Sequence, residues 1–215
     1  MISAKRKLLE IFAKTSFKSS TEPTYRLASG KLSRYYVDCK QALSDPRARA
    51  LIGQLVLDLV RNQSFESVGG LELGAYPVAT SVSDAIFQET SRIVRAFVIR
   101  KAPKSHGVRD LVAGHIEKGD TALIVDDVVT TGGSTIQAIR SAREAGLLVN
   151  QAIVLVDRQE DDGKRNIEAE GVKFDSLMTL SELRDLTNES VEGADPSDYR
   201  SASLHNRSGR ALLSR

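Results

Sequence analysis

The sequence predicts an α/β fold in which helices cover both faces of a parallel sheet. Two apolar segments, residues 121–127 and 151–158, show almost no alternation, which is typical of strands buried on both faces. Helical patterns lie between the apolar segments, and this is the order expected of a parallel sheet. The chain has 215 residues, of which 41% are hydrophobic, and this is enough to bury a full core.

The N-terminal segment, residues 1–14, is predicted to be an amphipathic helix with Leu8, Leu9 and Phe12 on one face. Its charges lie where a signal peptide would have an apolar centre. No apolar run reaches about 18 residues, so we expect no membrane association. The one cysteine, Cys39, excludes a disulfide framework and indicates a cytoplasmic protein. We interpret Cys39 as a small buried thiol.

A second helix is predicted over residues 44–63, where Asp45 suits the N-cap and Pro46 the first turn. Its expected apolar stripe consists of Leu51, Ile52, Leu55 and Leu59. The elements that follow are a short apolar piece at 67–70, a helix from about 77 to 90, a strand at 95–101, a turn at 118–120, a strand at 121–127, a helix at 136–146 and a strand at 151–158. The end of the chain is polar, and we expect it to be loosely ordered.

The segment LIVDDVVTTGGST, residues 123–135, carries the strongest functional pattern. Ligands of open parallel sheets bind at the carboxyl ends of the strands. We expect the strand to end at Val125, so that Asp126 and Asp127 lie where the chain leaves the sheet. Paired glycines, hydroxyl side chains and the N-terminus of a helix starting near Thr135 then make a cradle for a phosphate monoester. The expected ligand-contacting residues are Asp126, Asp127, Val128, Val129, Thr130, Thr131, Gly132, Gly133 and Ser134.

This loop differs from the two common nucleotide motifs, because it has neither GxxxxGK[ST] nor GxGxxG. Two carboxylates beside the cradle would repel a polyphosphate, but an ionised carboxylate accepts hydrogen bonds from hydroxyl groups. A ligand with a phosphate at one end and a diol beside it is a ribose 5-phosphate. The alternative is a polar turn whose acids cap a helix.

The same segment closely resembles the phosphoribosyl-diphosphate motif of the type I phosphoribosyltransferases. The resemblance implies that Asp126 and Asp127 contact the ribose hydroxyls and that residues 130–134 hold the 5-phosphate. It also implies a parallel-sheet core flanked by helices, with a small hood. We expect one domain over residues 1–187, of which about 1–40 contribute to the hood, and a polar tail over 188–215.

Further segments resemble the orotate phosphoribosyltransferases in order and spacing. They are ASGKLSRYYVDCK at 28–40, GGLELGAYPVA at 69–79, RKAPKSHG at 100–107 and VDRQE at 156–160. The resemblance covers roughly residues 8–186. It implies transfer of a phosphoribosyl group to N1 of orotate, giving orotidine 5′-monophosphate and pyrophosphate. It also implies a homodimer whose active sites are shared through the 100–110 loop.

The segment at 100–107 places four candidate cations, Arg100, Lys101, Lys104 and His106, within seven residues. Such donors suit a diphosphate leaving group, and one of them is expected to protonate it. A solvated basic loop is the alternative. Mg²⁺ is expected to arrive with the diphosphate, because this ion relies on phosphates and water more than on a protein cage. We therefore expect no metal site made of side chains, and His115 and His205 show no metal-ligand spacing.

Arg158 follows a predicted strand and can grip the carboxylate of orotate with two parallel hydrogen bonds. The alternative is a surface arginine paired with Glu160 or Asp162. The resemblance implies that Tyr36 lines the base pocket and that Ser29 lies in the neighbouring loop, although Tyr36 also suits a core. The sequence departs from the family pattern in two places. Many members carry lysine or serine at the position of Ala28, and some carry a lysine near Gly74.

Two other functions remain open at this point. One is a phosphoribosyltransferase for another base, against which residues 100–107 and Arg158 argue. The other is a ligand-sensing regulator that binds nucleic acid. The net charge of +2, with acids and bases interleaved along the chain, gives little support to nucleic-acid binding.

Overall fold

The computed structural model describes residues 2–27, 30–102 and 111–192. Its centre is a six-stranded sheet in the order β10-β9-β8-β5-β6-β7. The strands are β5 (Ser67–Leu71), β6 (Arg95–Ile99), β7 (Val112–Ala113), β8 (Thr121–Val129), β9 (Leu148–Asp157) and β10 (Lys173–Thr179). All neighbours pair in parallel except β6 and β7. The predicted α/β fold with a parallel sheet is confirmed.

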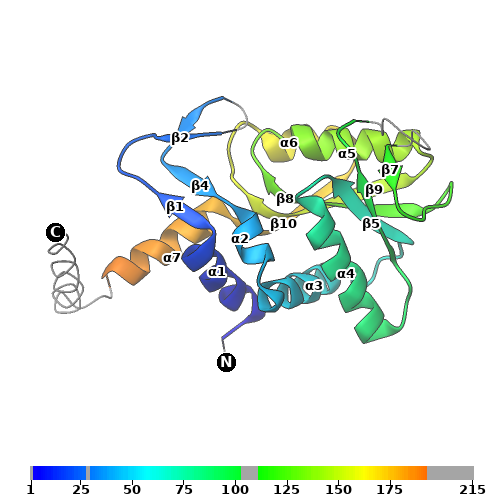
Figure 1. Ribbon diagram of the computed structural model, residues 1–215, viewed down its shortest axis with the longest axis horizontal. Coiled ribbons are helices and arrows are strands. Elements are labelled where there is room, and N and C mark those ends of the chain that lie inside the picture. The colour runs from blue at the N-terminus through cyan, green and yellow to red at the C-terminus, as the bar shows by residue number, and fades with distance from the viewer. Residues whose placement is uncertain (1, 28–29, 103–110, 193–215) are drawn as a thin grey trace, which may run out of the picture.

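Helices cover both faces of this sheet (Figure 1). They are α1 (Ala4–Thr15), α2 (Cys39–Leu43), α3 (Pro46–Val60), α4 (Ala75–Thr90), α5 (Gly133–Glu144), α6 (Gly163–Glu168) and α7 (Leu180–Glu192). Alternate β8 residues face opposite cores, since Leu123 and Val125 pack with α1, α3, α4 and α7 while Ile124 packs with α5 and α6. The near-continuous apolar run in β8 therefore reflects burial on both faces.

Residues 17–27 and 30–37, which we call the hood, form two small antiparallel pairs beside the sheet (Figure 1). Strand β1 (Phe17–Ser19) pairs with β4 (Tyr35–Val37), and β2 (Tyr25–Arg26) pairs with β3 (Leu32–Ser33). Helix α1 precedes the hood and packs into the core through the predicted face of Leu8, Leu9 and Phe12.

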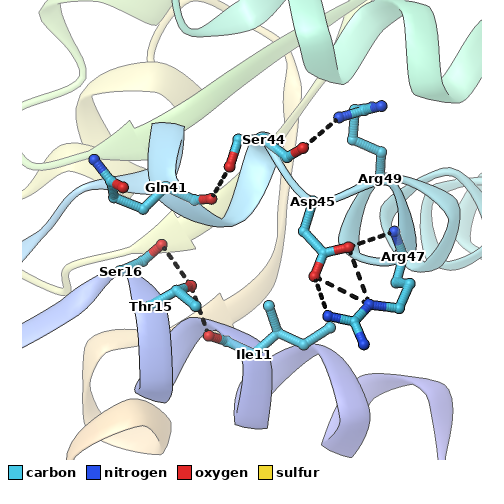
Figure 2. Close-up of polar contacts among 8 residues, drawn as sticks. All are labelled: Ile11, Thr15, Ser16, Gln41, Ser44, Asp45, Arg47 and Arg49. Atoms are coloured by element: carbon cyan, nitrogen blue, oxygen red, sulfur yellow. Dashed lines mark hydrogen bonds and ion pairs between the residues drawn. The ribbon is translucent and has the colours of Figure 1, made fainter.

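The junction of α2 and α3 is held by side-chain caps (Figure 2). As expected, the Asp45 carboxylate accepts from the Arg47 N–H at 2.8 Å, and Pro46 occupies the first turn of α3. The Arg47 guanidinium also binds Asp45, and the Arg49 guanidinium donates to the Ser44 carbonyl. These contacts fix the angle at which α3 leaves α2.

Three predicted details were wrong. The apolar stripe of α3 is centred on Ile52, Val56 and Val60, and Leu59 is 42% exposed because a spacing of four residues carries the buried face past it. Strand β8 continues to Val129, since the long β9 keeps pairing with it. Helices α4 and α5 begin earlier than expected, at Ala75 and Gly133.

Helix α7 runs to Glu192, through the position where the polar tail was expected to begin, and residues 193–215 lie outside the described part of the chain. None of the helices within residues 2–27, 30–102 and 111–192 has the length and apolar character needed to cross a bilayer.

Candidate active site

A cleft of about 520 Å³ opens at the carboxyl ends of β5 and β8. It brings together the acidic pair, the whole predicted phosphate loop and one residue of the basic segment. The residues that line it are Lys40, Leu71, Glu72, Leu73, Gly74, Lys101, Asp126, Asp127, Val128, Val129, Thr130, Thr131, Gly132, Gly133, Ser134 and Thr135. This is the edge at which open parallel sheets bind ligands.

The phosphate loop turns sharply at Gly132, which has φ +85°. A side chain there would be strained, and its Cβ would lie 2.9 Å from Ile167 Cγ1 and 3.0 Å from the Gly163 carbonyl oxygen. The turn starts α5 at Gly133, where the first backbone N–H groups have no carbonyl partner within the helix. A phosphate bound there would accept from these N–H groups and complement the positive end of the helix dipole.

The acidic pair lies near the carboxyl end of β8, and hydrogen bonds hold both side chains in place. Asp126 is 5% exposed, and its Oδ2 accepts from the buried Thr135 hydroxyl at 2.8 Å. Its Oδ1 accepts from the Asp127 N–H at 3.0 Å, and Asp127 Oδ1 accepts from the Val128 N–H at 2.9 Å. Both carboxylates are thus fixed before any ligand arrives.

Burial shifts both carboxyl groups toward neutrality. The pKa of Asp126 rises from 3.8 to about 7, first because burial penalises the charged form and second because of the charge on Asp127. The Thr135 hydrogen bond opposes this rise. Burial also raises the pKa of Asp127, while the positive charge of Lys40 lowers it. A ligand that donates hydrogen bonds from hydroxyl groups would favour the ionised forms.

Gly74, which precedes α4, makes room for Asp127. A Cβ at Gly74 would lie 2.5 Å from Asp127 Cγ and 2.6 Å from both carboxylate oxygens. Gly74 therefore has a steric role in this chain. In the same loop, Glu72 Oε1 accepts from the Lys101 N–H at 2.9 Å and ties the loop to the basic segment.

The basic segment is only partly described. Lys101 lines the cleft, whereas Arg100 is not among the lining residues and donates its N–H to the Leu111 carbonyl at 2.9 Å. Lys104 and His106 lie outside the described residues, as do Ala28 and Ser29.

Arg158 follows β9, and its N–H donates to the Val129 carbonyl at the start of the phosphate loop. Arg158 is 4% exposed, so the alternative of a surface arginine was wrong. The ion pair with Glu160 that this alternative named is present. Arg158 Nη2 also donates to Ser33 Oγ at 3.2 Å and to the Tyr35 carbonyl at 3.3 Å. Arg158 thus links the sheet to the hood.

Tyr36 lies on the hood surface, 36% exposed, and stacks on Tyr25 with 5.8 Å between ring centroids. It is therefore not a core aromatic. Cys39 is buried as expected, and its thiol donates to the Asp127 carbonyl at 3.6 Å. Within the described residues, no group of three or more His, Cys, Asp or Glu side chains is arranged to hold a metal ion.

Sequence reasoning did not name three of the polar side chains that line the cleft: Lys40, Glu72 and Thr135. Lys40 ends the YYVDCK stretch, and its charge acts on Asp127 across the fold. Thr135 was taken only as the start of a helix. The sequence did hold a signal for the contact between Thr135 and Asp126. Thr135 follows Asp126 by nine residues, at the start of the helix after the loop.

Comparison with known proteins agrees with this geometry. Residues 40–175 match the family model of the phosphoribosyl transferase domain. The chain is 42% identical over 179 residues to an orotate phosphoribosyltransferase of Aquifex aeolicus, covering 83% of this chain and 97% of that one. It is 39% identical over 158 residues to that of Methanocaldococcus jannaschii, covering 74% and 85%.

Solved structures give the same assignment. The crystal structure of Mycobacterium tuberculosis orotate phosphoribosyltransferase in complex with 5-phospho-alpha-D-ribosyl 1-diphosphate matches with a TM-score of 0.68 and 35% identity, over 84% of this chain and 99% of that one. An adenine phosphoribosyltransferase from Leishmania tarentolae, at 12% identity and a TM-score of 0.58, shares the fold alone. The chain belongs to the phosphoribosyl transferase family and, within it, to the orotate phosphoribosyltransferases.

Proposed function

We propose that this chain transfers the phosphoribosyl group of phosphoribosyl diphosphate to N1 of orotate, in pyrimidine biosynthesis. The observation that carries the proposal is the pairing of two recognition elements on neighbouring strands. The acidic pair lies near the end of β8 and the phosphate loop follows this strand, and the buried Arg158 follows β9 and reaches the hood. The first element suits a ribose 5-phosphate, and the second suits a carboxylated base.

In the reaction, the bond from ribose C1 to the diphosphate oxygen breaks and its electron pair leaves with pyrophosphate. The bond to N1 of orotate forms, and the N1 proton passes to solvent. No covalent nucleophile from the protein is needed, because orotate is the nucleophile. Asp126 and Asp127 hold the ribose hydroxyls, and their negative charge stabilises the positive charge that develops on the sugar. Lys101 and the other cations of residues 100–107 stabilise the charge on the leaving diphosphate.

Mg²⁺ is proposed to bind mainly through the diphosphate, whose charge it neutralises. The cleft carboxylates are Glu72, Asp126 and Asp127. All three accept hydrogen bonds from the protein. This donor set fits an ion that keeps phosphate and water ligands.

The direct test follows orotate consumption by ultraviolet absorbance, with phosphoribosyl diphosphate and Mg²⁺, for wild type and Lys104→Ala. We expect rapid consumption by wild type and a large fall in the variant. The same assay with uracil, adenine and guanine tests the choice of base. A folded wild type that consumes another base but no orotate would overturn the proposal.

We further propose that the enzyme is a homodimer in the cytoplasm. Tyr76 and Phe87 on α4 are 46% and 56% exposed and lie eleven positions apart, about three helical turns, so they share one face. Leu73, 69% exposed, extends this apolar face to the cleft. A second copy seated there would lie next to the active site, as sharing of the 100–110 loop requires.

The dimer is tested by light scattering on a sizing column. Phe87→Glu places a charge on the proposed interface, and Leu148→Glu, at an exposed leucine on β9, is the matched control. We expect a monomer for the first and a dimer for the second and for wild type. A wild-type monomer, or a Phe87→Glu dimer, would contradict the proposed interface.

A further inference from the structure

The guanidinium of Arg158 is already held along one edge by a carboxylate. Arg158 Nε donates to Glu160 Oε2 at 3.0 Å, and Nη2 donates to Glu160 Oε1 at 3.2 Å. This is the bidentate arrangement that arginine makes with carboxylates, and it fixes the plane of the guanidinium. Glu160 therefore already takes up the Nε edge of Arg158, which the substrate carboxylate could otherwise have bound with two hydrogen bonds.

The remaining donors of Arg158 can be counted. A guanidinium has five N–H groups, one on Nε and two on each terminal nitrogen. Glu160 takes the Nε hydrogen and one on Nη2, and Ser33 Oγ and the Tyr35 carbonyl share the other Nη2 hydrogen. The donors left, counting acceptors within the described residues, are the two on Nη1. A substrate carboxylate would therefore meet Nη1 first.

The loop after β9 holds Glu160 in place. Gln159 and Asp161, on either side of it, have φ +56° and +52°, a region that non-glycine residues rarely adopt. Such a backbone persists where its surroundings fix it. Here the Gln159 N–H donates to Asp157 Oδ1 at 2.8 Å, its side-chain oxygen accepts from Ser181, and Asp161 pairs with Lys31 of the hood.

We propose that Glu160 is a positioning residue for recognition of orotate, holding the Nε edge of Arg158 so that Nη1 faces the substrate carboxylate. The inference rests on the proposed function, because it takes orotate as the ligand of Arg158. Glu160 itself does not touch the substrate. Its second effect is to neutralise a buried cation in the free enzyme, since the Arg158 side chain is 3% exposed and that of Glu160 is 32% exposed.

The test measures KM for orotate and for phosphoribosyl diphosphate separately. Glu160→Ala removes two charge-assisted hydrogen bonds and lets the guanidinium rotate, so KM for orotate should rise roughly tenfold. KM for phosphoribosyl diphosphate should stay within about twofold, since the phosphate loop is untouched. Glu160→Gln keeps one acceptor and should restore part of the orotate affinity.

Glu168→Ala is the matched control, because Glu168 pairs with Lys164 on the surface of the nearby α6 and contacts neither Arg158 nor the hood. It should leave both constants unchanged. If Glu160→Ala binds orotate more tightly, Glu160 is a competitor of the substrate and the proposal falls. Equal rises in both constants, or no rise in KM for orotate in a folded Glu160→Ala, would also overturn it. Absence of orotate turnover in wild type would instead overturn the proposed function.

Discussion

The phosphate cradle and the proposed base pocket are built in different ways. The cradle uses one continuous stretch, residues 126–135, and its ligand groups are backbone N–H groups, hydroxyls and two carboxylates fixed by their neighbours. The proposed base pocket would be built around Arg158, which donates to Ser33 and Tyr35, 125 and 123 positions away in the sequence. One half of the site is local, and the other exists only after the hood has docked.

Because of this difference, variants in the two parts of the site should affect different substrates. The cradle is complete once β8 and α5 have formed, so its geometry depends little on the hood. The proposed base pocket depends on contacts between Arg158 and the hood, which is distant in sequence, and on the Lys31–Asp161 pair. We therefore expect changes in the cradle to act on phosphoribosyl diphosphate, and changes in the hood or the loop after β9 to act on orotate.

The largest effect is expected from Gly74→Ala. The new Cβ would lie 2.5 Å from Asp127 Cγ, so the carboxylate must leave its position. Misplacing a group that holds the ribose by about 1 Å costs on the order of 100-fold in kcat/KM for phosphoribosyl diphosphate. Steady-state kinetics, with thermal unfolding as the check on folding, measure this. An active variant with unchanged kcat/KM would show that the Asp127 position is unimportant.

The pH dependence of the cradle comes next. Asp126 accepts hydrogen bonds from the ribose most strongly when it is ionised, and its pKa is raised to about 7. We expect kcat/KM for phosphoribosyl diphosphate to fall about tenfold per pH unit below that value. Thr135→Val removes a hydrogen bond that lowers this pKa, so the fall in kcat/KM should begin at a higher pH in this variant. Thr187→Val, on α7, is the control, and an identical profile in Thr135→Val would contradict the account.

The same shift predicts how stability changes with pH. The folded pKa of Asp126 lies above its unfolded value of 3.8, so the folded state binds the proton more tightly. The contribution of Asp126 to the free energy of unfolding is thus full below pH 3.8, falls as the pH rises toward 7 and is constant above it. Asp126→Asn should flatten this slope in denaturant unfolding measured across the range, and an equal slope in the variant would argue against burial as the cause.

Lys40 offers a smaller test of the cradle. Its charge lowers the pKa of Asp127, and it lines the cleft. Lys40→Ala should weaken phosphoribosyl diphosphate binding by roughly fivefold, more at low salt than at high salt. Lys40→Arg keeps the charge and should recover most of the affinity. An equal loss of affinity in both variants would show that the shape of the Lys40 side chain matters and its charge does not.

The smallest effect is expected at the hood, from the Lys31–Asp161 pair. The Lys31 side chain is 67% exposed, and exposed pairs are worth little, so Lys31→Ala should raise KM for orotate roughly two- to fivefold. Asp161→Ala should do the same, and the double variant should be no worse than either single one. Additive effects would show that the two residues do not act together.

The sequence predicts the local part of the site better than the part that joins distant segments. Asp126, Asp127 and the loop after them were predictable because a phosphate cradle is a local pattern, readable from contiguous residues. The extension of β8 to Val129 was not, because it depends on pairing with β9. The burial of Arg158, its contact with Tyr35 and the place of Lys40 in the cleft depend on segments distant in sequence, and no local pattern encodes them.

The most direct test of the two-part site is calorimetric titration of phosphoribosyl diphosphate, with Mg²⁺, into Arg158→Ala and into the double variant Asp126→Asn, Asp127→Asn. If the cradle is independent of the base pocket, Arg158→Ala keeps the wild-type Kd within about twofold while turning over orotate far more slowly, and the double variant loses binding. Loss of phosphoribosyl diphosphate binding in a folded Arg158→Ala would show that the two halves are one unit, contrary to this account.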